Sequence, residues 1–138
     1  EELAVLLLYC GPYDIRSLDL NGKYSIFLKA VLWSYSGRKD FMTNPEFATL
    51  SVVDYVNADF PPAFISAGNG DPLAVHSQSL ARALSHIGVK VDTLFFPPDY
   101  KPAQPHEYQF NLDSNEGRFA LERSLEFLSV LRSGSGNL

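Results

Sequence analysis

The sequence predicts an α/β domain, with a parallel sheet of three strands and helices on both faces of it. Apolar, strand-like segments alternate with amphipathic, helix-like segments along the chain, which is typical of layered α/β domains. The first strand-like segment is apolar without interruption, as expected for a strand buried on both faces. The chain has 138 residues, of which 46% are hydrophobic and 20% charged, and this is sufficient for one globular domain.

The first part of the chain contains one predicted strand and two predicted helices. Glu1–Cys10 is a continuous apolar run that ends at a Gly-Pro turn, and we interpret it as the first strand. Lys23–Gly37 spaces its apolar residues as a helix does and ends at a glycine. The Asn-Pro dipeptide at 44–45 can cap and open a short helix that reaches about residue 50.

Two strands and the helix between them follow. Ala63–Ala67 is apolar, lies after a pair of prolines, and forms the second strand. Pro72–His86 carries an apolar stripe at helical spacing, and Gly88 is placed to end this helix in a left-handed conformation. Val89–Phe96 alternates imperfectly and forms the third strand.

The last predicted helix is Glu116–Arg132, capped by Ser114 or Asn115. Its large apolar residues are expected to face inward: Phe119, Leu121, Leu125, Leu128 and Leu131. Residues 1–132 then form the domain, and the Gly/Ser/Asn-rich residues 133–138 form a flexible tail.

Composition excludes several classes of function. The net charge of −5, without a cluster of lysine and arginine, argues against a nucleic-acid-binding protein. The longest apolar run, residues 3–9, is too short to span a bilayer and lacks the flanks of a signal peptide. The single cysteine excludes an internal disulfide and a cysteine-based metal site, and no pair of histidines has metal-ligand spacing, so no metal is expected. The cysteine is neutral about the compartment, and a cytoplasmic location is the working expectation.

Three segments fall at the carboxyl ends of the predicted strands: Cys10–Pro12, Gly68–Asp71 and the loop Pro97–His106. Ligands of parallel sheets bind beyond this edge. Asp71 and His106 therefore come together on neighbouring strands. A carboxylate that accepts the Nδ1–H of a histidine prepares that histidine to act as a base. We interpret Asp71 and His106 as two members of a hydrolytic triad.

The order of motifs along the chain supports this interpretation. G-N-G-D-P-L, then a helix, a G-V-K-V strand, P-H-E-Y-Q-F and a closing amphipathic helix resemble the C-terminal part of an α/β-hydrolase. The resemblance is closest to the hormone-sensitive-lipase-like esterases and lipases and covers Leu3 to about Leu131. Glu107-Tyr108 departs from it, because small residues often follow the histidine in that family.

The resemblance implies a partial α/β-hydrolase fold and a serine carboxylester hydrolase acting on short or medium acyl esters, without metal or organic cofactor. It also implies that the aromatic helix of residues 23–37 contributes Phe27, Trp33 and Tyr35 to the substrate pocket. That family's G-x-S-x-G elbow and oxyanion loop lie before the segment seen here, and neither pattern occurs in this sequence. Ser66 has the character of a strand serine. The isolated chain is therefore expected to be inactive, and strand 3–9 to associate with the missing N-terminal half or with a second copy.

Simpler interpretations remain open at each position. Asp71 suits a turn before a helix without any catalytic duty, and a loop histidine such as His106 often has none. His76 and His86 are interpreted as surface or helix-end histidines. Cys10 begins C-G-P-Y, half of a thioredoxin-type motif, but a small buried residue at a strand end fits better. At the level of the whole protein, the alternative to an enzyme is a non-catalytic α/β-hydrolase-like binding protein.

Overall fold

A computed structural model describes residues 3–134 and contains a three-stranded parallel sheet in the order β1-β2-β3. The strands are β1 (Leu6–Tyr9), β2 (Ala63–Ala67) and β3 (Val91–Phe95). β2 lies in the centre and pairs with both neighbours, with Ile65 opposite Leu8 on one side and Thr93 on the other. The predicted α/β class with three parallel strands is confirmed.

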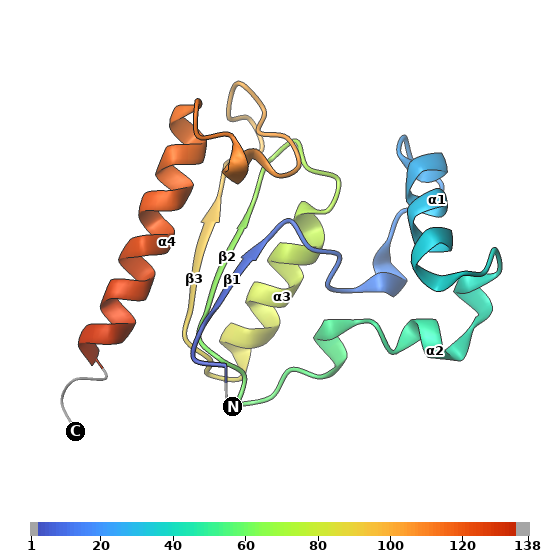
Figure 1. The fold of residues 1–138 in the computed structure, drawn as a ribbon, viewed down its shortest axis with the longest axis horizontal. Coiled ribbons are helices and arrows are strands. Elements are labelled where there is room, and N and C mark those ends of the chain that lie inside the picture. Colours follow the sequence, from blue (N-terminus) through green and yellow to red (C-terminus); the bar gives the residue numbers. More distant parts are fainter. Residues whose placement is uncertain (1–2, 135–138) are drawn as a thin grey trace.

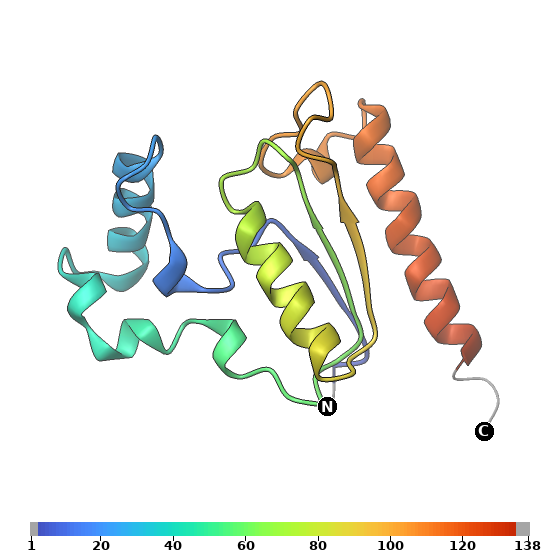
Figure 2. The ribbon, with the colours of Figure 1, turned by 180° about the vertical axis from the view of Figure 1, so that it is seen from behind.

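Four α-helices accompany the sheet within residues 3–134: α1 (Ser25–Ser36), α2 (Pro45–Ala48), α3 (Ala74–His86) and α4 (Asn115–Gly134). Figure 1 shows α3 and α4 on opposite faces of the sheet, while α1 and α2 lie to one side of it. The view from behind shows the same three layers and the same separate pair of helices (Figure 2). None of the helices in this described part of the chain combines the length and hydropathy required to cross a bilayer.

The first strand is shorter than predicted. Residues 3–5 are not paired in the sheet, and residues 1–2 lie outside the described part of the chain. β1 pairs with β2 alone among the described strands. β2 begins at Ala63, which lies opposite Leu6, so the paired part of β1 begins at Leu6. The pairing partner, rather than the apolar run, thus limits the length of β1.

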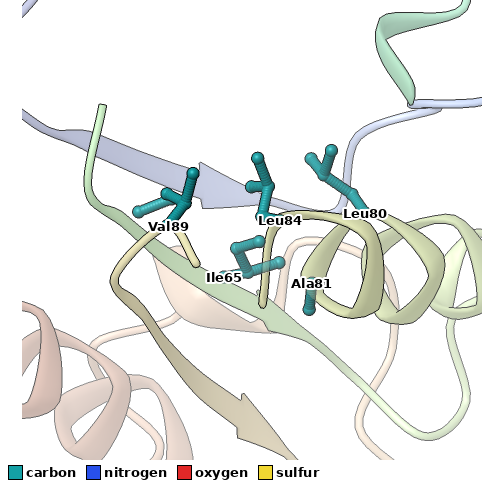
Figure 3. Close-up of a cluster of buried hydrophobic side chains, with 6 residues drawn as sticks. Ile65, Leu80, Ala81, Leu84 and Val89 are labelled. Carbon is teal, nitrogen blue, oxygen red and sulfur yellow. The ribbon is translucent and has the colours of Figure 1, made fainter. Parts of the chain in front are cut away.

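One face of the sheet packs on α3. β2 points Ala63 and Ile65 to this side, where they meet Leu80 and Leu84 of the helix. Figure 3 shows Ile65, Ala81 and Val89 converging with these two leucines. Leu80 and Leu84 are fully buried, as the predicted stripe requires, and Gly88 ends the helix region with a φ of 84°.

The other face packs on α4, but not through the predicted residues. Phe119, Leu121 and Leu125 are exposed, and Leu128 and Leu131 are half-buried. The buried positions of α4 are instead mostly small: Gly117, Ala120, Ser124 and Phe127. The Ser124 hydroxyl lies 2.6 Å from the Tyr9 hydroxyl of β1, so the Tyr9 side chain occupies the space that a leucine at that position would need. Ser114 accepts a hydrogen bond from Gly117 N and caps the helix, as predicted. The helix continues to Gly134 rather than ending at Arg132. Residues 135–138 of the predicted tail lie outside the described part of the chain.

The connection between β1 and β2 forms a small lobe with its own apolar cluster: Ile15, Leu18, Leu32, Phe41 and Phe47. Asn44 accepts a hydrogen bond from Glu46 N at the start of α2, and Gly37 adopts a left-handed φ of 68° after α1, as predicted. Leu73, just before α3, packs against this cluster. The lobe is therefore anchored beside the carboxyl end of β2.

The prediction for His76 is wrong, whereas His86 is exposed at the end of α3 as expected. The His76 side chain is buried, and its Nδ1 accepts a hydrogen bond of 3.3 Å from Asp14 N. Burial lowers the pKa of His76 below its usual 6.5. The turn that supplies Asp14 is remote in sequence from α3, so the local pattern around His76 does not indicate this contact.

Candidate active site

Two loops meet at the carboxyl ends of β2 and β3. The turn after β2 contains Gly68, Asn69 and Gly70, and the loop after β3 passes directly over it at Gln104. Gly70 N donates to Gln104 O at 2.8 Å, and Gln104 N donates to the Asn69 side chain at 2.8 Å. A Cβ on Gly68 would overlap the carbonyl group of Gln104, so this close approach requires glycine.

These hydrogen bonds between the two loops bring the two predicted residues, Asp71 and His106, together. His106 Nδ1 lies 3.1 Å from Asp71 Oδ1, within hydrogen-bond distance. The Asp71 side chain is fully buried, whereas that of His106 is 44% exposed. With Nδ1 directed at the carboxylate, Nε2 is the ring nitrogen that remains for a substrate or nucleophile. This is the arrangement that orients a histidine base.

Asp71 also has the structural role that its place before a helix suggested. Its Oδ1 accepts a hydrogen bond from Leu73 N at 2.8 Å, which shapes the turn into α3. Its Oδ2 is buried and has no hydrogen-bond partner within residues 3–134. A buried carboxylate oxygen without a partner is costly, so this oxygen requires an explanation such as a bound ligand or a functional role.

Cys10 lies directly beside this pair, at the end of β1. Its Sγ is one of three potential ligand atoms, with those of Asp71 and His106, that all lie within 4.8 Å of one another. Burial, together with the nearby Asp71 carboxylate, raises the pKa of the thiol to about 11. The Glu107 N–H donates a hydrogen bond to Sγ at 3.3 Å and lowers the pKa, but this offsets the effect of burial only in part. The thiol is therefore protonated at neutral pH and is a poor nucleophile. The alternative of a small buried residue at a strand end fits Cys10 better than a thiol-redox role.

The backbone on both sides of the site adopts an unusual conformation. Cys10 has a φ of 56° and Glu107 a φ of 59°, both in the left-handed region that non-glycine residues rarely occupy. Each costs about 1 kcal/mol relative to an ordinary conformation. Strained residues of this kind cluster at functional sites, and these two hold Sγ of Cys10 against the backbone next to His106.

A buried polar network beneath the pair was not predicted. Gln109 accepts a hydrogen bond from Cys10 Sγ at 3.2 Å and donates to the backbone oxygen of Ser66 at 3.1 Å. The Tyr108 and Ser66 hydroxyls lie 2.7 Å apart, and Ser66 donates to Leu94 O at 3.1 Å. Ser66 is thus a structural strand serine, as expected. Tyr108, which departs from the family pattern, points into the core and ties the loop after His106 to β2.

A pocket of about 270 Å³ opens beside His106 and is lined mainly by apolar side chains. Phe27 and Leu28 of α1 form one wall, and Leu73 and Pro105 contribute from the two site loops. Of the three predicted pocket residues, the structure brings Phe27 to His106. Trp33 lines a different pocket with Lys39, whose Nζ lies 4.6 Å from the centre of the indole ring, and Tyr35 is 83% exposed on α1.

Comparison with known proteins identifies a related fold. The chain is similar to the crystal structure of Esterase B from Lactobacillus rhamnosis (HN001), with a TM-score of 0.64 and 21% sequence identity. The match covers 94% of this chain and 40% of the esterase. No protein-family model matches the sequence, and no curated protein matches it. The predicted fold class, part of an α/β-hydrolase fold, is confirmed, since nearly all of the chain follows a segment of an esterase.

Proposed function

We propose that this chain supplies the aspartate and histidine of a serine carboxylester hydrolase, in which other protein sequence provides the nucleophilic serine and the oxyanion loop. The proposal rests above all on the 3.1 Å contact between His106 Nδ1 and Asp71 Oδ1 at the rim of an apolar pocket. The similarity of the fold to part of Esterase B supports it. The hormone-sensitive-lipase-like group remains the family that the motifs resemble most.

In the proposed reaction, His106 acts as base and then as acid. The serine oxygen attacks the ester carbonyl carbon, and its proton moves to Nε2 of His106. Buried Asp71 accepts the Nδ1–H and stabilises the imidazolium that forms. The proton on Nε2 then passes to the departing alkoxide oxygen. Water, activated by the same nitrogen, hydrolyses the acyl-serine and completes the cycle.

The pocket favours a small substrate. Its volume of about 270 Å³ lies just below the range of about 300–1,000 Å³ that is typical of sites for drug-sized ligands. Its apolar wall, which includes Phe27, suits a hydrocarbon group, and among the described residues neither a lysine nor an arginine lines it. We therefore propose esters with a short or medium acyl group as the substrates, with Phe27 as a substrate-contacting residue and Trp33 and Tyr35 as more remote candidates.

A binding protein with an α/β-hydrolase fold is the second candidate. The observation that favours it is the structural role of Asp71, whose Oδ1 accepts a hydrogen bond from Leu73 N at 2.8 Å and shapes the turn into α3. Such a protein would keep the pocket and the buried Asp71 for structural reasons. The residue at the position of the missing nucleophile separates the two functions, because only the enzyme requires serine there.

The test uses this chain and the same protein extended by the coding sequence that precedes it. The chain alone should give no saturable hydrolysis of p-nitrophenyl acetate, because loss of a triad nucleophile lowers the turnover rate about a million-fold. The extended protein should be labelled by a fluorophosphonate at one serine, and His106→Ala should abolish the labelling. His86→Ala, at an exposed histidine, is the matched control and should leave it unchanged. An extended protein without a reactive serine would favour the binding protein.

A further inference from the structure

Cys10, Asp71 and His106 together have the donor set of a metal site. Their ligand atoms, a thiol sulfur, a carboxylate oxygen and an imidazole nitrogen, all lie within 4.8 Å of one another. In a tetrahedral zinc site with bonds of about 2.0–2.3 Å, neighbouring ligand atoms lie about 3.3–3.8 Å apart. The 3.1 Å between Asp71 Oδ1 and His106 Nδ1 is already close to that spacing. Small movements of side chains would therefore complete three corners of a tetrahedron.

The carboxylate offers an independent indication of a ligand. Asp71 Oδ2 is buried and lacks a hydrogen-bond partner within the described chain, although Oδ1 of the same group has two. A cation between the carboxylate and the thiol would satisfy this oxygen. Local sequence spacing cannot reveal the site, because its three residues come from the ends of three different strands or from the loops that follow them.

We propose that Cys10, Asp71 and His106 bind one thiophilic divalent cation, such as Zn²⁺ or Cd²⁺. On binding, the Cys10 thiol releases its proton to water and a sulfur–metal bond forms. The neutral imidazole donates the lone pair of Nδ1, so the ring proton resides on Nε2. One carboxylate oxygen of Asp71 is the third ligand, and water from the adjoining pocket occupies the fourth position.

The cation has a route to the site through His106. This side chain is 44% exposed and borders the 270 Å³ pocket, whereas Cys10 and Asp71 are buried behind it. A rotation of the exposed imidazole would open the buried Cys10 and Asp71 to this pocket. Three ligands from separate elements would then hold β1, the turn after β2 and the loop after β3 together.

The consequence for catalysis rests on the proposed function. A metal on Nδ1 replaces the hydrogen bond between His106 and Asp71, and the proton on Nε2 removes the base that a serine needs. The site would therefore be inhibitory: the same residues serve either as a catalytic pair or as metal ligands. Zn²⁺ would inhibit the extended, serine-containing protein, and a chelator would restore its activity.

The binding test uses this chain alone and needs no ester. Co²⁺ and Cd²⁺ produce a thiolate-to-metal charge-transfer absorption, and the sequence has a single cysteine, so any such band reports Cys10. Titration should give one band that saturates at one metal per chain. Cys10→Ser should abolish the band, and His106→Gln, at a partly exposed position, should weaken Zn²⁺ binding at least about tenfold by calorimetry. His86→Ala is the matched control and should bind as the wild type does.

The absence of a charge-transfer band in the folded wild type would overturn the proposal. So would a band that His106→Gln leaves unchanged or that His86→Ala removes. The outcome is separable from the proposed function. A band in this chain, together with an extended protein that lacks a reactive serine, would support the metal site and refute the hydrolase; a reactive serine without a band would do the reverse.

Discussion

Replacing Gly68 by alanine should separate the loop that carries His106 from the turn that carries Asp71. An alanine Cβ would lie 2.7 Å from Pro105 O, against about 3.4 Å for an ordinary contact, so the loop must retreat by at least about 0.7 Å. A shift of that size along the hydrogen bond would stretch the 3.1 Å contact between His106 and Asp71 to about 3.8 Å, beyond hydrogen-bond range.

The expected cost combines overpacking with the hydrogen bonds that cross between the loops. Overpacking a tight site costs about 1–3 kcal/mol, and each lost hydrogen bond costs about 0.5–1.5 kcal/mol. The bonds at risk are those from Gly70 N to Gln104 O and from Gln104 N to the Asn69 side chain. Gly68→Ala should therefore lower the free energy of unfolding by about 2–6 kcal/mol.

Urea denaturation followed by far-ultraviolet circular dichroism measures that free energy, and hydrogen exchange at the Gly70 and Gln104 amides reports the two loops. Protection of both amides should fall in Gly68→Ala. Gly134→Ala is the control, because a Cβ there meets no atom within 4 Å, and its stability should stay within about 0.5 kcal/mol of the wild type. A Gly68→Ala protein with wild-type stability and protection would refute the close approach of the loops.

Two further predictions concern the buried phenols and the sheet edge. Burial raises the pKa of Tyr13 and Tyr108 to about 12 and that of Cys10 to about 11, so stability should be complete below about pH 9 and be lost as the pH rises towards 12. Tyr108→Phe, which loses the 2.7 Å contact with Ser66, should lower the free energy of unfolding by about 1 kcal/mol at pH 7 in urea denaturation. It should also make the loss of stability between about pH 10 and 12 smaller, and an unchanged alkaline profile would contradict this. β1 has an unpaired edge in the described sheet and Leu7 is 38% exposed, so the chain should self-associate in sedimentation velocity, and Leu7→Lys should weaken the association. A wild-type chain that stays monomeric at all concentrations would exclude a second copy of the chain as the partner of β1.

Local sequence signals predicted the elements well where breakers mark their ends. The bounds of β2 match the prediction because a proline pair precedes Ala63 and a glycine-rich turn follows Ala67. Packing that depends on distant partners was predicted less well. The inward face of α4 is set by its close approach to Tyr9, which selects Ser124 over the neighbouring leucines. The burial of His76 similarly depends on a turn from the β1–β2 connection.

The same division applies to the candidate site. Asp71 and His106 were predicted from a general property of parallel sheets, namely that the residues after neighbouring strands meet at one edge. The roles of Gln109 and Tyr108 could not be predicted, because each side chain forms hydrogen bonds with residues far apart from it in the chain. Cys10 carried a usable signal, its position at the end of the first strand, but one cysteine alone did not suggest a cluster of potential metal ligands.

The tautomer of His106 tests the central claim most directly. Nitrogen-15 shifts of the histidine side chains distinguish a ring protonated at Nδ1 from one protonated at Nε2. If Asp71 orients His106 as a catalytic base, neutral His106 carries its proton on Nδ1, and Asp71→Asn disturbs this tautomer while His86→Ala does not. A wild-type His106 protonated at Nε2 in metal-free solution would contradict the account.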